Sequence, residues 1–240
     1  MRLHLQLKSI AWGCGGAFLL LLPIVPFNPL SRPLPAIGQT RVVRSDRAQT
    51  ELDNLIDTGF DLQNEGKHEE ALAVFDRVLQ TDPERLQAWN GRAWALWSLF
   101  RYDEMLTAFD RVVNLAPDSA DSWYGRGTAL YYLDRYQDSI AAYDRGLELN
   151  PAYDRNWSGR GWSRQQLGRD EEALADFDRA LELNPDNANT WQARGWSLYQ
   201  LGRYQEALSS LDRALEISPN FQYALDKRAI ILQKIEELGL

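Results

Sequence analysis

The sequence predicts an all-α solenoid of stacked, antiparallel helix hairpins, because three residue types recur with a period of 34 residues. Five prolines follow this period, at Pro83, Pro117, Pro151, Pro185 and Pro219. Four tryptophans share it, at Trp89, Trp123, Trp157 and Trp191. Asp-Arg dipeptides recur with the same spacing, from residues 76–77 to residues 212–213. Three independent residue types on one period indicate a structural repeat.

Numbering each unit so that its proline stands at position 32 gives five units, at 52–85, 86–119, 120–153, 154–187 and 188–221. Positions 4, 7, 8 and 11 fall on one face of a first helix, and positions 20, 21, 24, 27 and 28 on one face of a second. The proline ends the second helix, because it has no N–H and restricts the residue before it. One hairpin leaves its apolar face uncovered, so the units must stack. Residues 222–240 form a C-terminal capping helix, whose polar residues suit contact with water.

Unit four carries a bulky residue at position 4, small residues at 8 and 20, an aromatic at 24, alanine at 27 and proline at 32, and units two and three depart from this pattern at positions 20 and 27. In unit four these are Trp157, Gly161, Ala173, Phe177, Ala180 and Pro185. The pattern resembles the tetratricopeptide repeat (TPR) family. The resemblance implies a right-handed superhelix with its first helices on the concave side. It also implies a non-enzymatic scaffold that binds a protein or peptide.

Residues 1–38 have the composition of an export signal. Arg2 and Lys8 precede an uncharged, mostly apolar run at residues 10–27, and Ala36 and Gly38 offer the small residues of a cleavage site. This leader predicts either a cleaved signal peptide or a retained membrane anchor. Both alternatives place the repeats outside the cytoplasm, in a periplasmic, secreted or membrane-anchored protein. Residues 39–51 are predicted to be a polar linker, helical near its end.

Charge and composition exclude several classes of function. The net charge is −8, and residues 1–38 hold three bases and no acid, so the remaining 23 bases and 34 acids give −11. A nucleic-acid partner is therefore not expected. The single cysteine, Cys14, and one of the two histidines, His4, lie in the leader. The repeats thus offer no Cys or His set for a metal, and no motif of a cofactor site or a catalytic centre. The sequence predicts that the protein is not an enzyme.

Charged residues at positions 7 and 25 form two series that are offset by one unit. We predict that they pair across each unit boundary and fix the stacking register. The predicted pairs are Asp76 with Arg92, Asp110 with Arg126, Asp144 with Arg160, Asp178 with Arg194, and Asp212 with Arg228. Arginines also recur at position 16, where they form either a solvated edge or a basic rim for an acidic ligand.

The resemblance implies that positions 2, 5, 9, 12 and 13 of the first helices are exposed on the concave side. The candidate partner-binding residues stand at positions 5, 9, 12 and 13. Aromatic rings with polar groups, mixed with amides, suit the recognition of a peptide or an amphipathic helix. The alternatives are a glycan that stacks on Trp94, Trp97, Trp162 and Trp196, or rings that merely pack against the next hairpin. The candidates are Asn90, Trp94, Trp97, Tyr124, Tyr131, Tyr132, Trp162, Gln192, Trp196 and Tyr199.

Overall fold

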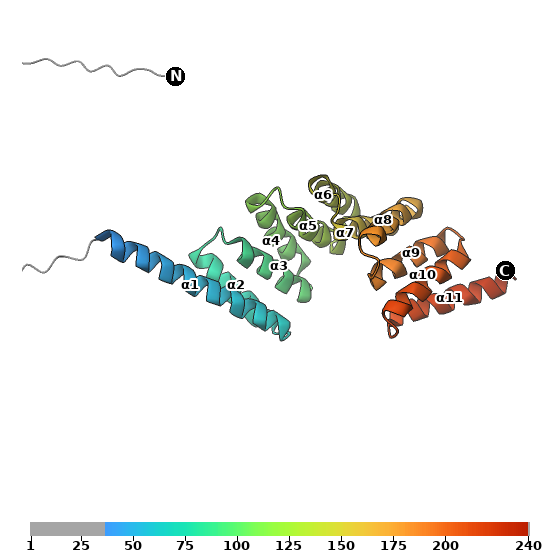
Figure 1. Ribbon diagram of the computed structural model, residues 1–240, viewed down its shortest axis with the longest axis horizontal. Helices are drawn as coiled ribbons and strands as arrows, with labels where there is room; N and C mark the ends of the chain where they lie inside the picture. Colours follow the sequence, from blue (N-terminus) through green and yellow to red (C-terminus); the bar gives the residue numbers. More distant parts are fainter. Residues whose placement is uncertain (1–36, 240) are drawn as a thin grey trace, which may run out of the picture. The chain divides into compact units, whose positions relative to one another are not determined.

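The computed structural model describes residues 37–239, and within them all regular structure is helical (Figure 1). The predicted all-α fold of helix hairpins is confirmed. The chain divides into two units, Met1–Arg44 and Ser45–Leu240, and the side chains considered below belong to the second. The helices are α1 (Ile37–Asn64), α2 (His68–Thr81), α3 (Leu86–Ser98), α4 (Tyr102–Leu115), α5 (Ala120–Tyr132), α6 (Tyr136–Leu149), α7 (Asp154–Gln166), α8 (Asp170–Leu183), α9 (Ala188–Gln200), α10 (Tyr204–Ile217) and α11 (Gln222–Leu238).

First and second helices alternate along the repeats with constant lengths. The first helices α3, α5, α7 and α9 have 13 residues each, and the second helices α2, α4, α6, α8 and α10 have 14. Each of these helices packs on its neighbours along the chain. This nearest-neighbour packing is the arrangement of a repeat solenoid.

Helix α1 is longer than the others and changes one expectation. It begins at Ile37, so residues 39–51 are helical throughout rather than only near their end. The expected polar linker therefore continues into the first helix of unit one. The expected leader lies almost wholly outside the described residues, and so does its apolar run at 10–27. Within residues 37–239, no helix combines the length and the apolarity needed to cross a membrane.

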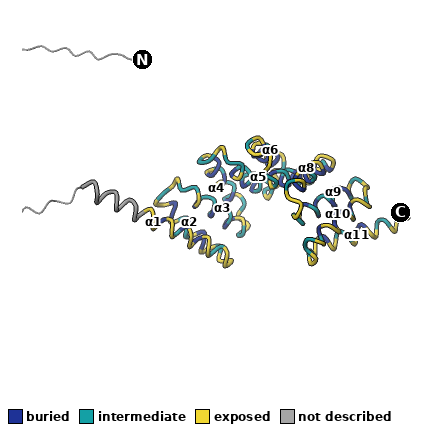
Figure 2. Tube along the Cα trace, in the orientation of Figure 1, coloured by how far each residue is buried: buried dark blue, intermediate teal, exposed yellow. Residues whose placement is uncertain are grey.

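The core lies between successive helices, and buried residues (dark blue in Figure 2) recur along the helices of the repeats. The aromatic ring at position 24 is its main component, as Phe75, Phe109, Tyr143 and Phe177 are all almost fully buried. Leucine, valine and alanine side chains fill the space around these rings. Burial of this apolar surface supplies the main driving force for stacking.

The tryptophans at position 4 lie on the packing face of the first helix, a pattern that predicts core residues, but the structure shows them half-buried. Each indole N–H donates to the carbonyl oxygen of the proline six residues earlier, at 2.8 Å in all four cases. For example, Trp157 Nε1 donates to the carbonyl oxygen of Pro151. The bond links the end of one unit to the first helix of the next and gives the recurring tryptophan a role. The acceptor is a backbone carbonyl, so the proline recurs for another reason, which is that it ends the second helix.

Candidate functional site

A cleft of about 280 Å³ opens across the first helices α5, α7 and α9 and the final helix α11. Every residue that lines it is uncharged, and tyrosines, a tryptophan and amides predominate. Four candidates from the sequence contribute to it: Tyr131, Tyr132, Trp162 and Gln192. The other lining residues are Gln165, Gln166, Asn189, Ala193 and Tyr223.

The amides of the cleft fall into two groups. Gln165 and Gln166 form hydrogen bonds to neighbouring first helices. Gln165 Nε2 donates to the Ala193 carbonyl at 3.0 Å, and Gln166 Nε2 donates to the Tyr131 hydroxyl at 3.2 Å. Asn189 and Gln192 have no side-chain hydrogen bond to any described residue. Asn189 is exposed, so its amide is open to a ligand, whereas Gln192 is only 8% exposed and meets a ligand only where it lines the cleft.

Tyr223 is a cleft residue that the sequence reasoning missed. It lies at position 2 of the incomplete sixth unit and is 52% exposed. Position 2 of a first helix is one of the expected concave-face positions, so extending the repeat numbering into the capping helix would have found it.

Three predicted residues do not line the cleft, and two of them pack on rings of neighbouring helices. The Trp94 ring is 5.2 Å from the buried Phe109 ring and 6.3 Å from the Tyr124 ring, measured between centroids. Asn90 donates to the Leu86 carbonyl of its own helix at 3.3 Å. Burial raises the pKa of the Tyr124 hydroxyl above its usual value. At Trp94 and Tyr124, packing between units outweighs exposure to a ligand.

Trp196 and Tyr199 pack on each other, with ring centroids 4.9 Å apart. The Lys227 ammonium group of α11 lies 3.4 Å from the centroid of the Trp196 ring. Trp162 packs on the buried cluster that contains Phe177. Of the four tryptophans considered for sugar stacking, Trp97 alone is more than a third exposed. Trp94, Trp162 and Trp196 are half-buried, so each would offer a glycan only part of its ring.

All five predicted Asp–Arg pairs are in contact. The nitrogen–oxygen distances are 2.7 Å for Arg92, 2.8 Å for Arg126, 2.5 Å for Arg160, 2.6 Å for Arg194 and 2.6 Å for Arg228. The arginines of units two to five also lie over the position-4 tryptophan of their own helix, with Arg160 nearest at 4.6 Å from the ring centroid. The aspartates are about half exposed, so each pair contributes little to stability.

Unit four contains a buried ion network that the sequence reasoning missed. Asp176 is 2% exposed and accepts from Arg160 at 2.6 Å and from Arg164 at 2.7 Å. Arg160 also binds Asp144, so one arginine joins two carboxylates. The sequence does signal this network at position 11, where unit four has Arg164 and each of the other four units has leucine.

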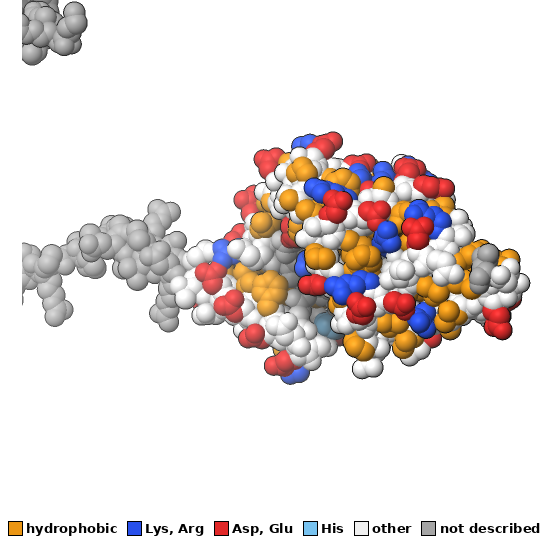
Figure 3. Space-filling view, turned by 45° about the vertical axis from the view of Figure 1, so that its right-hand side comes forward, with side chains coloured by type: hydrophobic (Ala, Val, Ile, Leu, Met, Phe, Trp, Pro, Cys, Tyr) orange, Lys and Arg blue, Asp and Glu red, His pale blue; other side chains and the backbone are white. Residues whose placement is uncertain are grey.

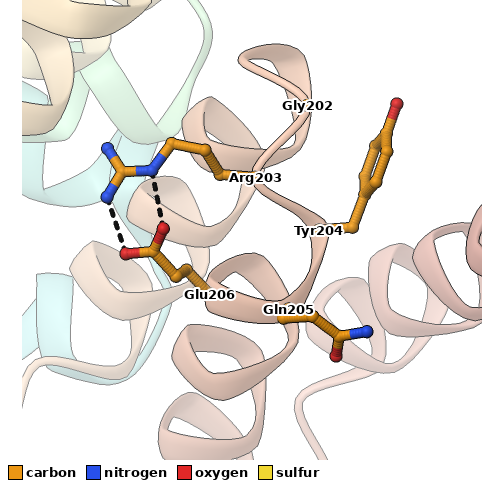
Figure 4. A pocket seen from close by; sticks show the side chains of 5 residues that line it. All are labelled: Gly202, Arg203, Tyr204, Gln205 and Glu206. Carbon is orange, nitrogen blue, oxygen red and sulfur yellow. Dashed lines mark hydrogen bonds and ion pairs between the residues drawn. The ribbon is translucent and has the colours of Figure 1, made fainter. Parts of the chain in front are cut away.

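The arginines at position 16 are neutralised locally. Arg203 makes two hydrogen bonds to Glu206, while Tyr204 points away from this pair (Figure 4). Arg101, Arg135 and Arg169 bind the carboxylate three residues later in the same way. On the face in Figure 3, basic side chains accordingly lie beside acidic ones. These contacts favour a solvated edge over a basic rim for an acidic ligand. Within the described residues, no group of three or more His, Cys, Asp or Glu side chains is placed to hold a metal ion.

Family models of the tetratricopeptide repeat match residues 56–120, 120–153 and 158–220. These matches cover more than half of the chain, so the protein belongs to the tetratricopeptide repeat family, as the resemblance indicated. No curated protein matches the chain.

Solved structures with the same fold include three TPR-type chains. TTC0263 of Thermus thermophilus is 23% identical, with a TM-score of 0.65 over 76% of this chain and 99% of that one. YrrB, described as a TPR protein with an unusual peptide-binding site, is 24% identical, with a TM-score of 0.56 over 73% and 90%. MamA of Desulfovibrio magneticus RS-1 is 18% identical, with a TM-score of 0.61 over 71% and 96%. At these identities the likeness establishes the fold.

Proposed function

We propose that the protein is a non-enzymatic scaffold that binds a peptide or an extended segment of a partner protein in the cleft across α5, α7, α9 and α11. The observation that carries the proposal is the pair of unpartnered amides, Asn189 and Gln192, beside the aromatic side chains of an uncharged cleft. An amide side chain pairs with the N–H and C=O groups of an extended backbone. Tyrosine and tryptophan supply rigid contact area with polar groups at their edges.

A peptide fits this cleft better than other ligand classes. The acidic charge of the repeats disfavours nucleic acid, and the paired arginines leave no free cationic cluster for a polyanion among the described position-16 residues. YrrB, which shares the fold, is described as having a peptide-binding site. That description concerns YrrB, and it supports the proposal by analogy of fold.

We further propose that the repeats act outside the cytoplasm. The support is the composition of residues 1–38, with a basic start, an apolar middle and a small-residue exit. Cleavage after the leader would release the repeats, whereas retention would tether them to a membrane through residues 10–27.

The cleft is tested with peptides selected by the purified full chain from a random displayed library. The double variant Asn189→Ala/Gln192→Ala should bind these peptides about thirtyfold more weakly, because two hydrogen bonds worth roughly 1 kcal/mol each are lost. Fluorescence anisotropy of labelled peptides measures the affinity.

A matched control replaces two exposed amides on second helices, Asn114→Ala/Gln137→Ala, and should bind as the wild type does. Equal affinities of the cleft variant and the wild type would show that the peptides bind elsewhere. Failure of the selection to yield any binding peptide would contradict the proposed function itself.

A further inference from the structure

Six aromatic side chains form a connected surface beside the cleft, at the turns between the helices of units two and three. We call it the aromatic rim. Each ring contacts at least one other at a centroid distance between 4.8 and 6.3 Å, and the Tyr132 ring contacts three of them, stacking on Tyr102. Tyr131 and Tyr132 also line the cleft, so the two surfaces are continuous. The members are Trp97, Phe100, Tyr102, Tyr131, Tyr132 and Tyr136.

Phe100 is the least expected member. It is 78% exposed, and its backbone φ is +59°, in the left-handed region that disfavours a bulky side chain. Glycine occupies the same turn position in units one, four and five, at Gly66, Gly168 and Gly202. The turn therefore forms without phenylalanine. Exposure and backbone strain at one residue point to a role outside the fold.

The charges around the rim are already used within the chain. Arg101 binds Glu104 through two hydrogen bonds, and Arg135 binds Asp138. The Tyr136 hydroxyl donates to Asp134 at 2.5 Å. The rim is therefore a neutral surface of flat rings, with hydroxyl and indole N–H groups at their edges.

We propose that the aromatic rim binds a proline-rich segment of a partner protein in the polyproline II conformation. This inference rests on the proposed function and names the chemistry of the partner segment. Pyrrolidine rings pack flat on aromatic rings, and the polyproline II backbone makes no internal hydrogen bonds, so its carbonyls are free to accept from tyrosine and tryptophan.

The dimensions of such a segment suit the rim. A polyproline II helix has three residues per turn and rises ~3.1 Å per residue, so residues on one side recur about every 9 Å. Neighbouring ring centroids of the rim are 4.8 to 6.3 Å apart, so one turn of the segment reaches across more than one ring. A bilayer surface is a less suitable occupant, because the net charge of the repeats is acidic and the neighbouring arginines are already paired.

The probe is fluorescein-labelled decaproline, titrated with the full chain and followed by anisotropy, with a glycine–serine peptide of equal length as the reference. Decaproline should bind saturably and the reference should not. The variant Phe100→Gly should bind decaproline about tenfold more weakly, because an exposed ring that contacts the ligand is removed.

The same variant should unfold at a higher temperature than the wild type, because glycine relieves the positive φ. A role in the fold alone would lower that temperature.

The control Leu167→Ala removes another exposed apolar side chain, from the corresponding turn of unit four, and should leave decaproline binding unchanged. The proposal is overturned if Phe100→Gly binds as tightly as the wild type, or if decaproline binds no better than the reference. It is also overturned if the chain binds phosphatidylcholine vesicles and not decaproline. If decaproline fails while library peptides still bind at Asn189 and Gln192, the rim proposal alone is wrong. If no peptide binds anywhere, the proposed function is wrong as well.

Discussion

Glycine at position 6 of a first helix lets the aromatic ring at position 24 of the preceding unit reach the helix backbone. A Cβ atom built on Gly125 would lie 2.1 Å from the Phe109 ring, and one on Gly91 would lie 2.3 Å from the Phe75 ring. The sequence pattern predicted small residues at positions 8 and 20, but not this contact at position 6. The contact joins two units, so it appears only once the units are stacked.

Gly125→Ala should therefore destabilise the protein. Overpacking costs about 1–3 kcal/mol, of which the better helix propensity of alanine returns at most about 1 kcal/mol. Urea unfolding followed by circular dichroism measures the change.

Ala193→Gly is the reverse change at the same position of unit five, where the alanine methyl already packs in the buried cluster with Phe177. It should cost about 1–2 kcal/mol, from helix propensity and the lost buried methyl together. A Gly125→Ala protein as stable as the wild type would show that the Phe109 ring moves aside without cost.

At the scale of one hairpin, α7 and α8 differ from their equivalents in the ion pair between them. Arg164 and Asp176 are 17% and 2% exposed, at positions where the other units hold uncharged residues. A buried pair of this kind adds little net stability, yet removal of one partner leaves an uncompensated charge.

We expect Asp176→Ala alone to lower the free energy of unfolding by about 3 kcal/mol. The double variant Arg164→Leu/Asp176→Ala restores the residues found in units two and three, and its stability should return to that of the wild type or exceed it. Urea unfolding of the single and double variants tests this coupling.

Asp110→Asn offers a comparison from the half-exposed boundary pairs and should cost under about 1 kcal/mol. If the double variant is as unstable as the single one, the network contributes more than charge compensation.

At the scale of the whole molecule, the final helix departs from the expected water-facing cap. Large apolar side chains of α11 are exposed, among them Leu225, Ile230 and Leu232. Leu225 and Leu232 stand at positions 4 and 11, and position 11 is buried in units two, three and five. Among the described residues no second helix follows α11, so part of its repeat face stays uncovered.

Export is also a property of the whole molecule, and it is tested by N-terminal sequencing of the protein isolated from cells. A first residue near Gln39 is expected if the leader is cleaved, and Met1 together with recovery in the membrane fraction if it is retained. Recovery of an uncleaved chain from the cytoplasmic fraction would contradict both alternatives.

The sequence by itself determined the repeat, the hairpins and the candidate charge pairs. Each depends on residues that recur with one period and on contacts between adjacent units, so the same local rule applies in every unit. Four of the ten candidate binding residues line the cleft for the same reason: positions 5, 9, 12 and 13 lie on one side of a first helix.

Only the tertiary structure decided which aromatic side chains remain available to a ligand. Trp94 and Trp196 share position 9, but Phe109 packs on the first and Lys227 lies over the second. Trp97 and Phe100 are left exposed. Exposure at these positions depends on side chains of neighbouring helices, and those side chains differ from unit to unit. A repeat pattern therefore fixes where a side chain stands, while the packing of its particular neighbours decides whether it is covered.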